Sequence, residues 1–451
     1  MGTIRSVFLS FSLVGLAMNQ ANAALSDVEV ERLGQDLTPV GAEKLGNGDD
    51  IPAWRGGLKK DESLKPGEFH PDPFRADQPL FRITAANIDQ HQERLSHGQQ
   101  VLLKTFPDLF FEVYPSRRSA SYPDYVYQAV KDNASSAELL KYGSGVTGAT
   151  MSSPFPMPQN GLEVLWNHTL RFRGHSFSFS DYTASVLKSG SRSDTLRDHQ
   201  YFFNYSVPGI SPEDLDNKIF FLKRKTLAPS NLAGRIALVH ETLDQVRSPR
   251  KSWLYVPGQR RLRRTPDLSY DSPDESTNSV RTVDQVDMYN GAPDYYNWKL
   301  IGKQELYIPY NAYKLHQGDL TNDEILLEKH INSGLLRYEP HRVWVIEATL
   351  RVGFDHKYAK RRYYVDEDSW SIVVAEEYSE SGELLQVTEA HTINFYDIQL
   401  VYPTMEVTYD LEDGGYFAEG LDNERGSTLN FSESYTKRNF STGTVRREAR
   451  R

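Results

Sequence analysis

The sequence predicts a mainly β protein of the α+β class, built around one large, twisted antiparallel sheet. From Leu162 onward, apolar and polar residues alternate with period two in many short segments, which is typical of half-buried strands. Turns rich in Gly, Ser and Asp separate successive segments, which favours antiparallel hairpins. Tyr, Phe and Trp make up 12% of the chain, and these side chains suit the pleated surface of a sheet.

We divide the chain of 451 residues into four parts, of which the first, residues 1–23, is a predicted signal peptide. The apolar run Val7–Ala17 is too short to cross a bilayer, and Ala21-Asn22-Ala23 fits the cleavage pattern. Cleavage after Ala23 would leave Ala24, not Cys, at the N-terminus. We therefore expect a periplasmic protein that is not a lipoprotein. A retained N-terminal membrane anchor is the alternative.

The other three parts follow from composition and periodicity. Residues 24–79 predict an extended arm, because Gly, Pro and Asp are frequent and periodicity is weak. Residues 80–440 form the predicted helix-plus-sheet domain. Residues 441–451 carry four Arg and form a basic tail.

Within the domain, helices are expected before the strands. The range 84–106 predicts one helix, with Gly98 as a candidate point of division, and the range 123–140 predicts a second. A short helix at Gly209–Leu215 interrupts the strands. The predicted strand segments are Leu170/Phe172, Phe177/Phe179, Tyr201–Tyr205, Ile219–Leu222, Arg235–Glu241, Lys251–Val256, Trp344–Val352, Arg362–Val365, Ser371–Tyr378 and Leu384–Phe395.

The composition argues against nucleic acid as a partner, against disulfide bonds and against further membrane-spanning segments. The formal net charge is −10, and an acidic protein is a poor match for nucleic acid. The chain has no Cys, so no disulfide can form. No apolar stretch after residue 23 approaches membrane-spanning length.

Signatures of common enzyme sites are missing or incomplete. Gly174-His175-Ser176-Phe177-Ser178 has Ser where a nucleophile elbow needs its second Gly, so we interpret Ser176 as a sheet hydroxyl. His240-Glu241 lacks the second His of a zinc-protease motif. We therefore predict that the protein is not an enzyme, with no catalytic residue, no metal site and no cofactor.

The acidic triplet Asp366-Glu367-Asp368 is open to two interpretations. It matches a hairpin turn, and its carboxylates could also form a cation site or an acid–base pair. We favour an exposed turn of solvated charges, because no neighbouring sequence supplies the desolvation that such chemistry needs.

One basic segment stands out in this acidic chain. Trp253 and Tyr255 are predicted on one face of a strand, with Leu254 and Val256 on the other. The turn that follows leads to four clustered arginines: Arg260, Arg261, Arg263 and Arg264. These side chains would meet anions, either as cross-strand ion pairs within the fold or at a lipid head group or an acidic partner.

The spacing W-x-Y-x-P-x-x-R-R-x-R-R in this segment is similar to a pattern in periplasmic proteins related to the outer-membrane lipoprotein-sorting carriers. Over nearly all of the mature chain, the sequence resembles the family called domain of unknown function 1329, whose members are periplasmic proteins of proteobacteria. The blocks that carry the resemblance are Pro79–Thr84 with Asn87, Val113–Arg118 with Pro123, Asn160–Glu163 with Trp166–His168, Tyr289–Trp298 and Arg361–Trp370.

The resemblance implies a more specific fold and setting. The sheet is expected to form an open half-barrel, similar to the lipoprotein carriers, with a few helices in its concave face and a hydrophobic cavity between them. Members of the family often accompany export pumps and outer-membrane proteins in hydrocarbon or sterol metabolism. The resemblance implies no catalytic residue.

We therefore predict a periplasmic carrier or chaperone for a hydrophobic cargo: a lipid, a lipoprotein acyl chain, a sterol or a hydrocarbon. An inner-membrane export pump and an outer-membrane protein are candidate partners, and nucleic acid is not. The alternative is a docking adaptor for such partners that carries no cargo. The candidate cavity residues are Trp253, Tyr255, Trp344 and Ile346, and the candidate contacts to a head group or partner are Arg260, Arg261, Arg263 and Arg264.

Overall fold

The computed structural model describes residues 24–265, 272–274 and 277–450, so the predicted signal peptide lies outside the described residues. Fifteen strands form one sheet: β1 (Phe81–Ile83), β2 (Phe111–Val113), β5 (Ser176–Val186), β6 (Arg192–Phe203), β7 (Lys218–Ala228), β8 (Ile236–Thr242), β9 (Lys251–Val256), β10 (Arg261–Thr265), β11 (Tyr296–Pro309), β12 (Tyr338–Leu350), β13 (Lys360–Asp366), β14 (Ile372–Tyr378), β15 (Leu384–Phe395), β16 (Leu400–Asp410) and β17 (Tyr416–Leu421).

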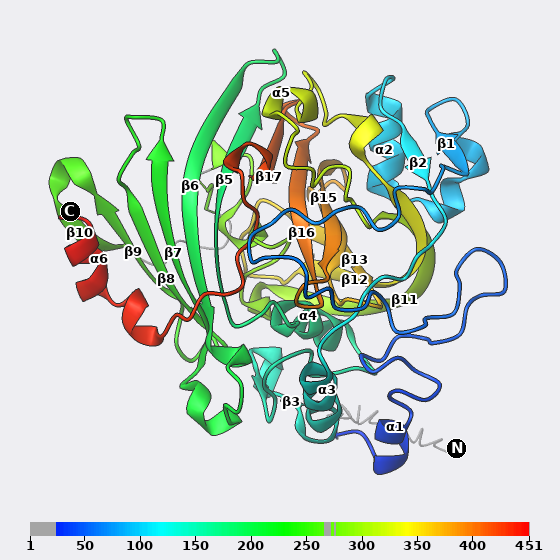
Figure 1. The fold of residues 1–451 in the computed structure, drawn as a ribbon, viewed down its shortest axis with the longest axis horizontal. Helices are drawn as coiled ribbons and strands as arrows, with labels where there is room; N and C mark the ends of the chain where they lie inside the picture. Colours follow the sequence, from blue (N-terminus) through cyan, green and yellow to red (C-terminus); the bar gives the residue numbers. More distant parts are fainter. Residues whose placement is uncertain (1–23, 266–271, 275–276, 451) are drawn as a thin grey trace, which may run out of the picture.

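The strands follow the order β1-β2-β12-β13-β14-β15-β16-β17-β5-β6-β7-β8-β9-β10, and β11 pairs with β12 (Figure 1). Neighbouring strands run antiparallel, apart from one parallel contact that joins Tyr338 of β12 to Val113 of β2. Among the described residues the end strands β1 and β10 do not pair, so the sheet stays open. The predicted fold class, a mainly β protein with a large open antiparallel sheet, is confirmed.

The described residues form six α-helices and a separate two-stranded hairpin. The helices are α1 (Asp27–Glu31), α2 (His97–Thr105), α3 (Asp124–Ser136), α4 (Gly161–Leu170), α5 (Asn322–Ile325) and α6 (Thr442–Glu448), and the hairpin joins β3 (Glu138–Leu139) to β4 (Val146–Thr147). No helix in the described ranges is long and apolar enough to cross a membrane.

The predicted helix over residues 84–106 is shorter in the structure than the sequence suggested. Only α2 is α-helical, and Ser96 starts it by accepting a hydrogen bond from the Gln99 N–H. Gly98 does not divide this helix. A Cβ at Gly98 would lie 2.8 Å from a methyl carbon of Val387, so the glycine lets α2 approach β15 closely.

Helix α4 replaces the start of the predicted strand region. The Asn160 side chain accepts a hydrogen bond from the Glu163 N–H and caps the helix. Buried residues then occur on every side of α4. The strands β11 and β12 pack on one side of the helix, and other segments of the chain pack on the opposite side. A helix buried all round lacks the polar face by which sequence periodicity is recognised.

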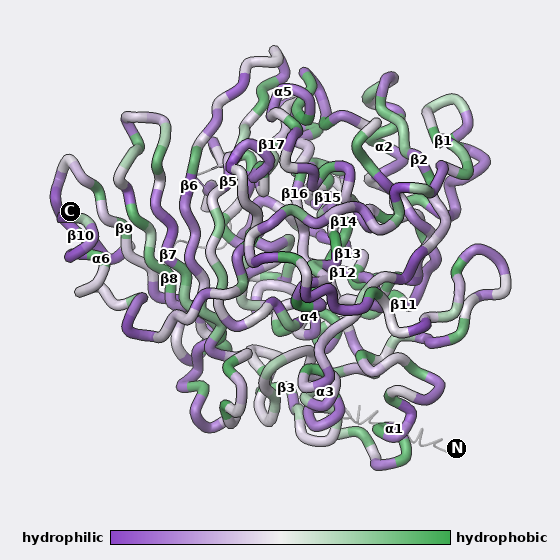
Figure 2. The backbone as a smooth tube through the Cα atoms, in the orientation of Figure 1, coloured by the Kyte–Doolittle hydropathy of each residue, from purple (hydrophilic) through white to green (hydrophobic). Residues whose placement is uncertain are grey.

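The two halves of the sheet are covered differently. Over β12–β16, helix α2 packs on one face and α3 and α4 contribute to a cluster on the other. Over β7–β10, helix α6 and the segment before it cover one face. Figure 2 shows hydrophilic and hydrophobic residues interleaved along the strands of this second half.

The predicted N-terminal arm lies across the sheet domain, as the blue trace in Figure 1 shows. The Trp54 indole N–H donates to the Ala120 carbonyl at 3.0 Å, and the Trp370 indole N–H donates to the Val40 carbonyl at 2.9 Å. The predicted basic tail contains α6, whose Val445 is fully buried.

Candidate functional site

Side-chain alternation divides strands β5–β10 into two faces. On one face, Phe179 pairs with His199, Tyr201 with Leu222, and Leu222 with Val239. Leu254 and Arg263 continue this face onto β9 and β10. We call it the strap face, because a later segment of the chain crosses it. The opposite, helix face carries Phe202, Phe221, Leu238 and Tyr255, which pack with Phe440 and Val445 from the C-terminal segment.

The segment that crosses the strap face is residues 277–290, here called the strap. It is held at three places by charged side chains; two of these places are on strands of the sheet and one is on the segment between α4 and β5. Arg281 donates to Glu419 at 2.6 Å, and Asp284 accepts from Arg361 at 2.5 Å. Asp287 accepts from Arg171 at 2.5 Å and also from Arg173. Burial acts to raise the pKa of Asp287, but the two arginines lower it to about 2, so the carboxylate stays ionised.

Apolar side chains on the strap face keep part of their surface accessible. Phe179, Tyr201, Val239 and Leu254 are each half-buried. The aromatic rings stack along the strands, with Phe179 and His199 centroids 4.3 Å apart and Phe177 and Tyr201 centroids 4.8 Å apart. On the helix face, the C-terminal segment buries Phe202, Phe221, Leu238 and Tyr255, whereas Trp253 and Leu262 stay half-buried. The strap face offers a longer run of accessible apolar side chains, from Phe179 to Leu254.

The four candidate cavity residues lie in two separate clusters. Trp253 and Tyr255 are on the helix face, and Tyr255 is buried beneath α6. Trp344 and Ile346 lie on β12 in the cluster that α3 and α4 cover. Ile346 is fully buried, whereas Trp344 is half-buried, with the Lys303 ammonium 4.7 Å above its ring. The structure does not bring the two pairs together.

The four candidate arginines are all exposed. None forms an ion pair with any residue that the structure describes. The β9–β10 ladder separates three of them by face: Arg261 and Arg263 pair with Val256 and Leu254 on the strap face, and Arg264 pairs with Trp253 on the helix face. Arg260 occupies the left-handed turn between the strands, with φ of 49°.

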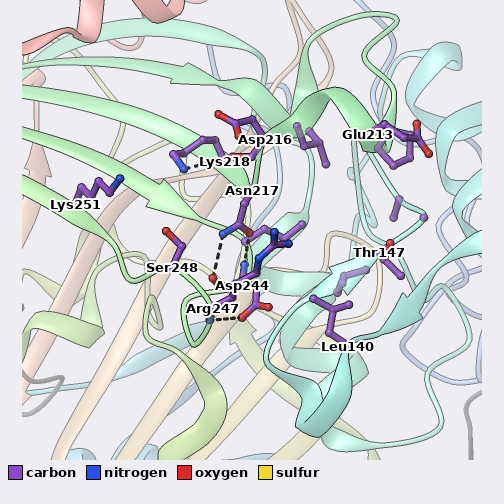
Figure 3. A pocket seen from close by; sticks show the side chains of 16 residues that line it. Leu140, Thr147, Glu213, Asp216, Asn217, Lys218, Asp244, Arg247, Ser248 and Lys251 are labelled. Atoms are coloured by element: carbon purple, nitrogen blue, oxygen red, sulfur yellow. Dashed lines mark hydrogen bonds between the residues drawn. The ribbon is translucent and has the colours of Figure 1, made fainter.

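A pocket of about 680 Å³ lies below the ends of β7 and β8, beside the β3–β4 hairpin (Figure 3). Polar side chains dominate its lining, including Lys218, Lys251 and Arg247. The Asn217 amide bridges the pocket wall to the Asp244 backbone, donating at 3.1 Å and accepting at 2.7 Å. This polar lining does not match the apolar cavity expected of a carrier.

The acidic turn Asp366-Glu367-Asp368 differs from its predicted setting. It is a turn, but its three side chains are at most 3% exposed, so the interpretation as an exposed, solvated turn is wrong. Arg118, 250 residues away in sequence, donates to both Asp368 oxygens, at 2.8 and 2.7 Å. Burial and the charge of Asp368 raise the pKa of Asp366 to about 7. The desolvation that the local sequence lacks comes from distant segments.

A profile of one protein family matches residues 82–446, and its description is a protein of unknown function, DUF1329. An uncharacterized protein of Pseudomonas aeruginosa is 43% identical over 438 residues, which cover 96% of each chain.

Two solved structures are similar at low sequence identity. A putative outer-membrane lipoprotein-sorting protein domain from Vibrio parahaemolyticus is 14% identical with a TM-score of 0.43, covering 63% of this chain and 98% of its own. A DUF1329 family protein from Desulfovibrio piger is 13% identical with a TM-score of 0.41, covering 60% and 92%. On the strength of the family profile and the Pseudomonas relative, the chain belongs to the DUF1329 family of proteins of unknown function.

Proposed function

We propose that this protein is a non-enzymatic periplasmic carrier that binds a hydrophobic molecule on the strap face of β6–β9. The observation that carries the proposal is the row of half-buried apolar side chains on that face, Tyr201, Val239 and Leu254 among them. Each methylene of cargo that leaves water contributes about 0.8 kcal/mol. A single acyl chain or sterol would therefore bind without a dense set of polar contacts.

The arginines at the edge of the sheet extend the proposal to amphipathic cargo. Arg261 and Arg263 share the strap face with Val256 and Leu254, and both side chains are exposed. A cargo whose tail lies along Leu254 would bring an anionic head group within reach of these guanidinium groups, which bind carboxylates and phosphates through paired hydrogen bonds. The cargo class proposed is thus a lipid or fatty acid with an acidic head.

A fluorescent long-chain fatty acid tests the apolar part of the proposal. In detergent-free protein, the double variant Val239→Asn/Leu254→Asn should bind the probe about tenfold more weakly, since two apolar contacts are lost. Leu187→Asn is the matched control, because Leu187 is 57% exposed on a hairpin tip. Equal affinities in all three proteins would overturn the proposed site.

The arginines of β10 allow a second test, because two of them lie on the strap face and one lies on the opposite face and serves as the control. Arg261→Gln/Arg263→Gln should weaken binding of the fatty acid several-fold and leave binding of an uncharged hydrocarbon probe unchanged. Arg264→Gln, on the opposite face, should change neither. If Arg264→Gln has the larger effect, the arginines serve a docking surface instead. Mass spectrometry of an organic extract of the periplasmic protein would identify the natural cargo.

A further inference from the structure

A second site is formed near the start of β12 and the end of β13, beside the acidic turn and apart from the strap face. The His341 Nδ1 atom lies 3.9 Å from Asp366 Oδ1 and 3.9 Å from Asp368 Oδ2. These three atoms all lie within 4.8 Å of one another. The side chains are at most 3% exposed, so a nitrogen and two carboxylate oxygens converge in a region that excludes solvent.

The hydrogen bonds around these residues orient them toward a common point. His341 uses its other ring nitrogen, Nε2, in a contact of 3.3 Å with Glu339 Oε2. Glu339 is itself fixed by Arg337 at 2.6 Å and by the Arg117 backbone N–H at 2.7 Å. A proton on Nε2 leaves the Nδ1 lone pair directed at the two aspartates. This histidine–carboxylate pairing is the arrangement that positions metal-ligating histidines.

Two buried polar atoms at the site lack a hydrogen-bond partner among the described residues. One is Asp366 Oδ1, although Oδ2 of the same carboxylate accepts from Ser369 at 2.6 Å. The other is the Tyr310 hydroxyl, whose ring stacks on His341 with centroids 4.0 Å apart. No Lys or Arg of the described chain forms an ion pair with Asp366. The carboxylate thus has a free oxygen that faces His341.

We propose that His341, Asp366 and Asp368 together bind one divalent transition-metal ion, with Zn²⁺ the best match to this ligand set. Imidazole nitrogen and carboxylate oxygen are both zinc ligands, with bonds of about 2.0–2.2 Å. Tetrahedral ligands at that distance lie about 3.4 Å apart. The two separations of 3.9 Å between His341 and the aspartates are close to this value, and the third lies within 4.8 Å, so metal binding would draw the two aspartates toward one another.

The site connects the sheet to the N-terminal arm. Arg118, which is paired with Asp368, also donates to the Glu43 carbonyl at 2.8 Å and to the Pro52 carbonyl at 3.2 Å. Asp368 Oδ2, which faces His341, also accepts from Arg118 Nε, so a metal ion there would share this carboxylate with the arginine that holds the arm. The proposed role is therefore structural. It is independent of the cargo proposal, and its test measures metal content and arm order, not cargo binding.

The first experiment measures metal in full-length mature protein purified without chelator, by elemental mass spectrometry. Wild type should contain about one zinc per chain, and Asp366→Asn at least tenfold less. The matched control is Asp422→Asn, which alters another buried aspartate with a raised pKa outside the cluster. It should keep its zinc. EDTA should lower the Tm of wild type by roughly 3 °C or more and leave that of Asp366→Asn unchanged.

A second measurement needs no variant and protects the test against misfolding. Wild-type protein stripped with EDTA and reloaded with Co²⁺ should show the visible absorption of four-coordinate cobalt, and limited proteolysis should cut residues 24–79 faster before reloading than after. Wild type that contains no zinc and shows no cobalt spectrum would overturn the proposal and leave a water molecule as the occupant. The same holds if Asp366→Asn and wild type bind cobalt equally.

Discussion

Strands β15 and β6 belong to the same sheet, but they differ in how much of their surface is covered. Eleven of the twelve residues of β15 are buried, against four of the twelve of β6. In β15 apolar and polar residues alternate over much of the strand, whereas the first nine residues of β6 are polar except for Leu196. In β6 three of the four buried residues, Arg197, His199 and Phe203, lie on the strap face, whereas in β15 both faces are buried, including polar residues such as Glu389. The polarity of residues along a strand therefore does not by itself show which face of the strand is exposed to water.

The buried polar residues of β12–β16 are satisfied by partners far away in sequence. Arg361 is fully buried and pairs with Asp284 at 2.5 Å and Glu377 at 3.3 Å. Tyrosine rings surround its guanidinium group, the Tyr358 centroid lying 5.2 Å away. In the other half, Arg192 of β6 forms comparable pairs at the surface. The same interaction type thus occurs in two environments, and the predictions below test the difference.

The largest effect is expected from Arg361→Met. It leaves Asp284 and Glu377 buried without their cation, which should lower the free energy of unfolding by about 4 kcal/mol. Arg192→Met, the matched surface variant, should change it by less than about 1 kcal/mol. Urea denaturation measures both. Similar losses in the two variants would contradict the contrast between the halves.

Phe440→Ala should lower the free energy of unfolding by about 3 kcal/mol. Phe440 is fully buried, and its ring joins α6 to the helix face. Its centroid lies 6.1 Å from that of Phe221 and 6.3 Å from that of Phe202. Amide hydrogen exchange should accelerate in β7–β9 and remain slow in β13–β15. Uniform acceleration would mean that the two halves unfold together.

Glu389→Gln tests how burial of a carboxyl group affects the pH dependence of stability. Burial raises the pKa of Glu389 to about 7, above its unfolded value, so the folded state favours the protonated form. The stability this contributes is present below about pH 4.5 and is lost as the pH rises through 7. As the pH rises from 5 to 7.5, the free energy of unfolding of the variant should therefore increase by about 2 kcal/mol relative to that of wild type. Glu380→Gln, on an exposed turn, should show no such trend.

The smallest effect is expected on the strap face. Val239→Ser should change the free energy of unfolding by about 1 kcal/mol or less, because Val239 is half-buried. Its neighbour Leu238 is fully buried on the helix face, and Leu238→Ser should cost about 3 kcal/mol. Thermal denaturation of the pair compares the two faces of a single strand. Equal losses would show that the strap face is as well sealed as the helix face.

Where periodicity was strong, the sequence was sufficient to predict the fold class and the order of the helices and strands. The hairpin around residues 366–371 and the short helix at 212–215 were predicted close to their observed positions. Helix α4 was missed because burial on all sides removes its polar face. The Asn160–Glu163 cap was the one local signal that could have revealed it.

The proposed metal site shows the limit of local patterns more sharply. Twelve scattered histidines gave no ligand spacing, and Asp366-Glu367-Asp368 read as a solvated turn. His341 and Asp366 are brought together because β12 pairs with β13, where Val343 is opposite Asp366. Arg118 reaches the same place from another segment. No spacing rule along the chain could have joined these residues.

By itself, the sequence determined that the chain is mainly β, that its strands follow one another in hairpins, and that it belongs to its family. These properties depend on alternation, turn residues and blocks of matching sequence, all of which are local. Only the tertiary structure decided which face of each strand is covered, because the arm, the strap and α6 come from distant parts of the chain. Burial then sets the chemistry, since a carboxylate changes its behaviour when segments far away in sequence exclude water from it.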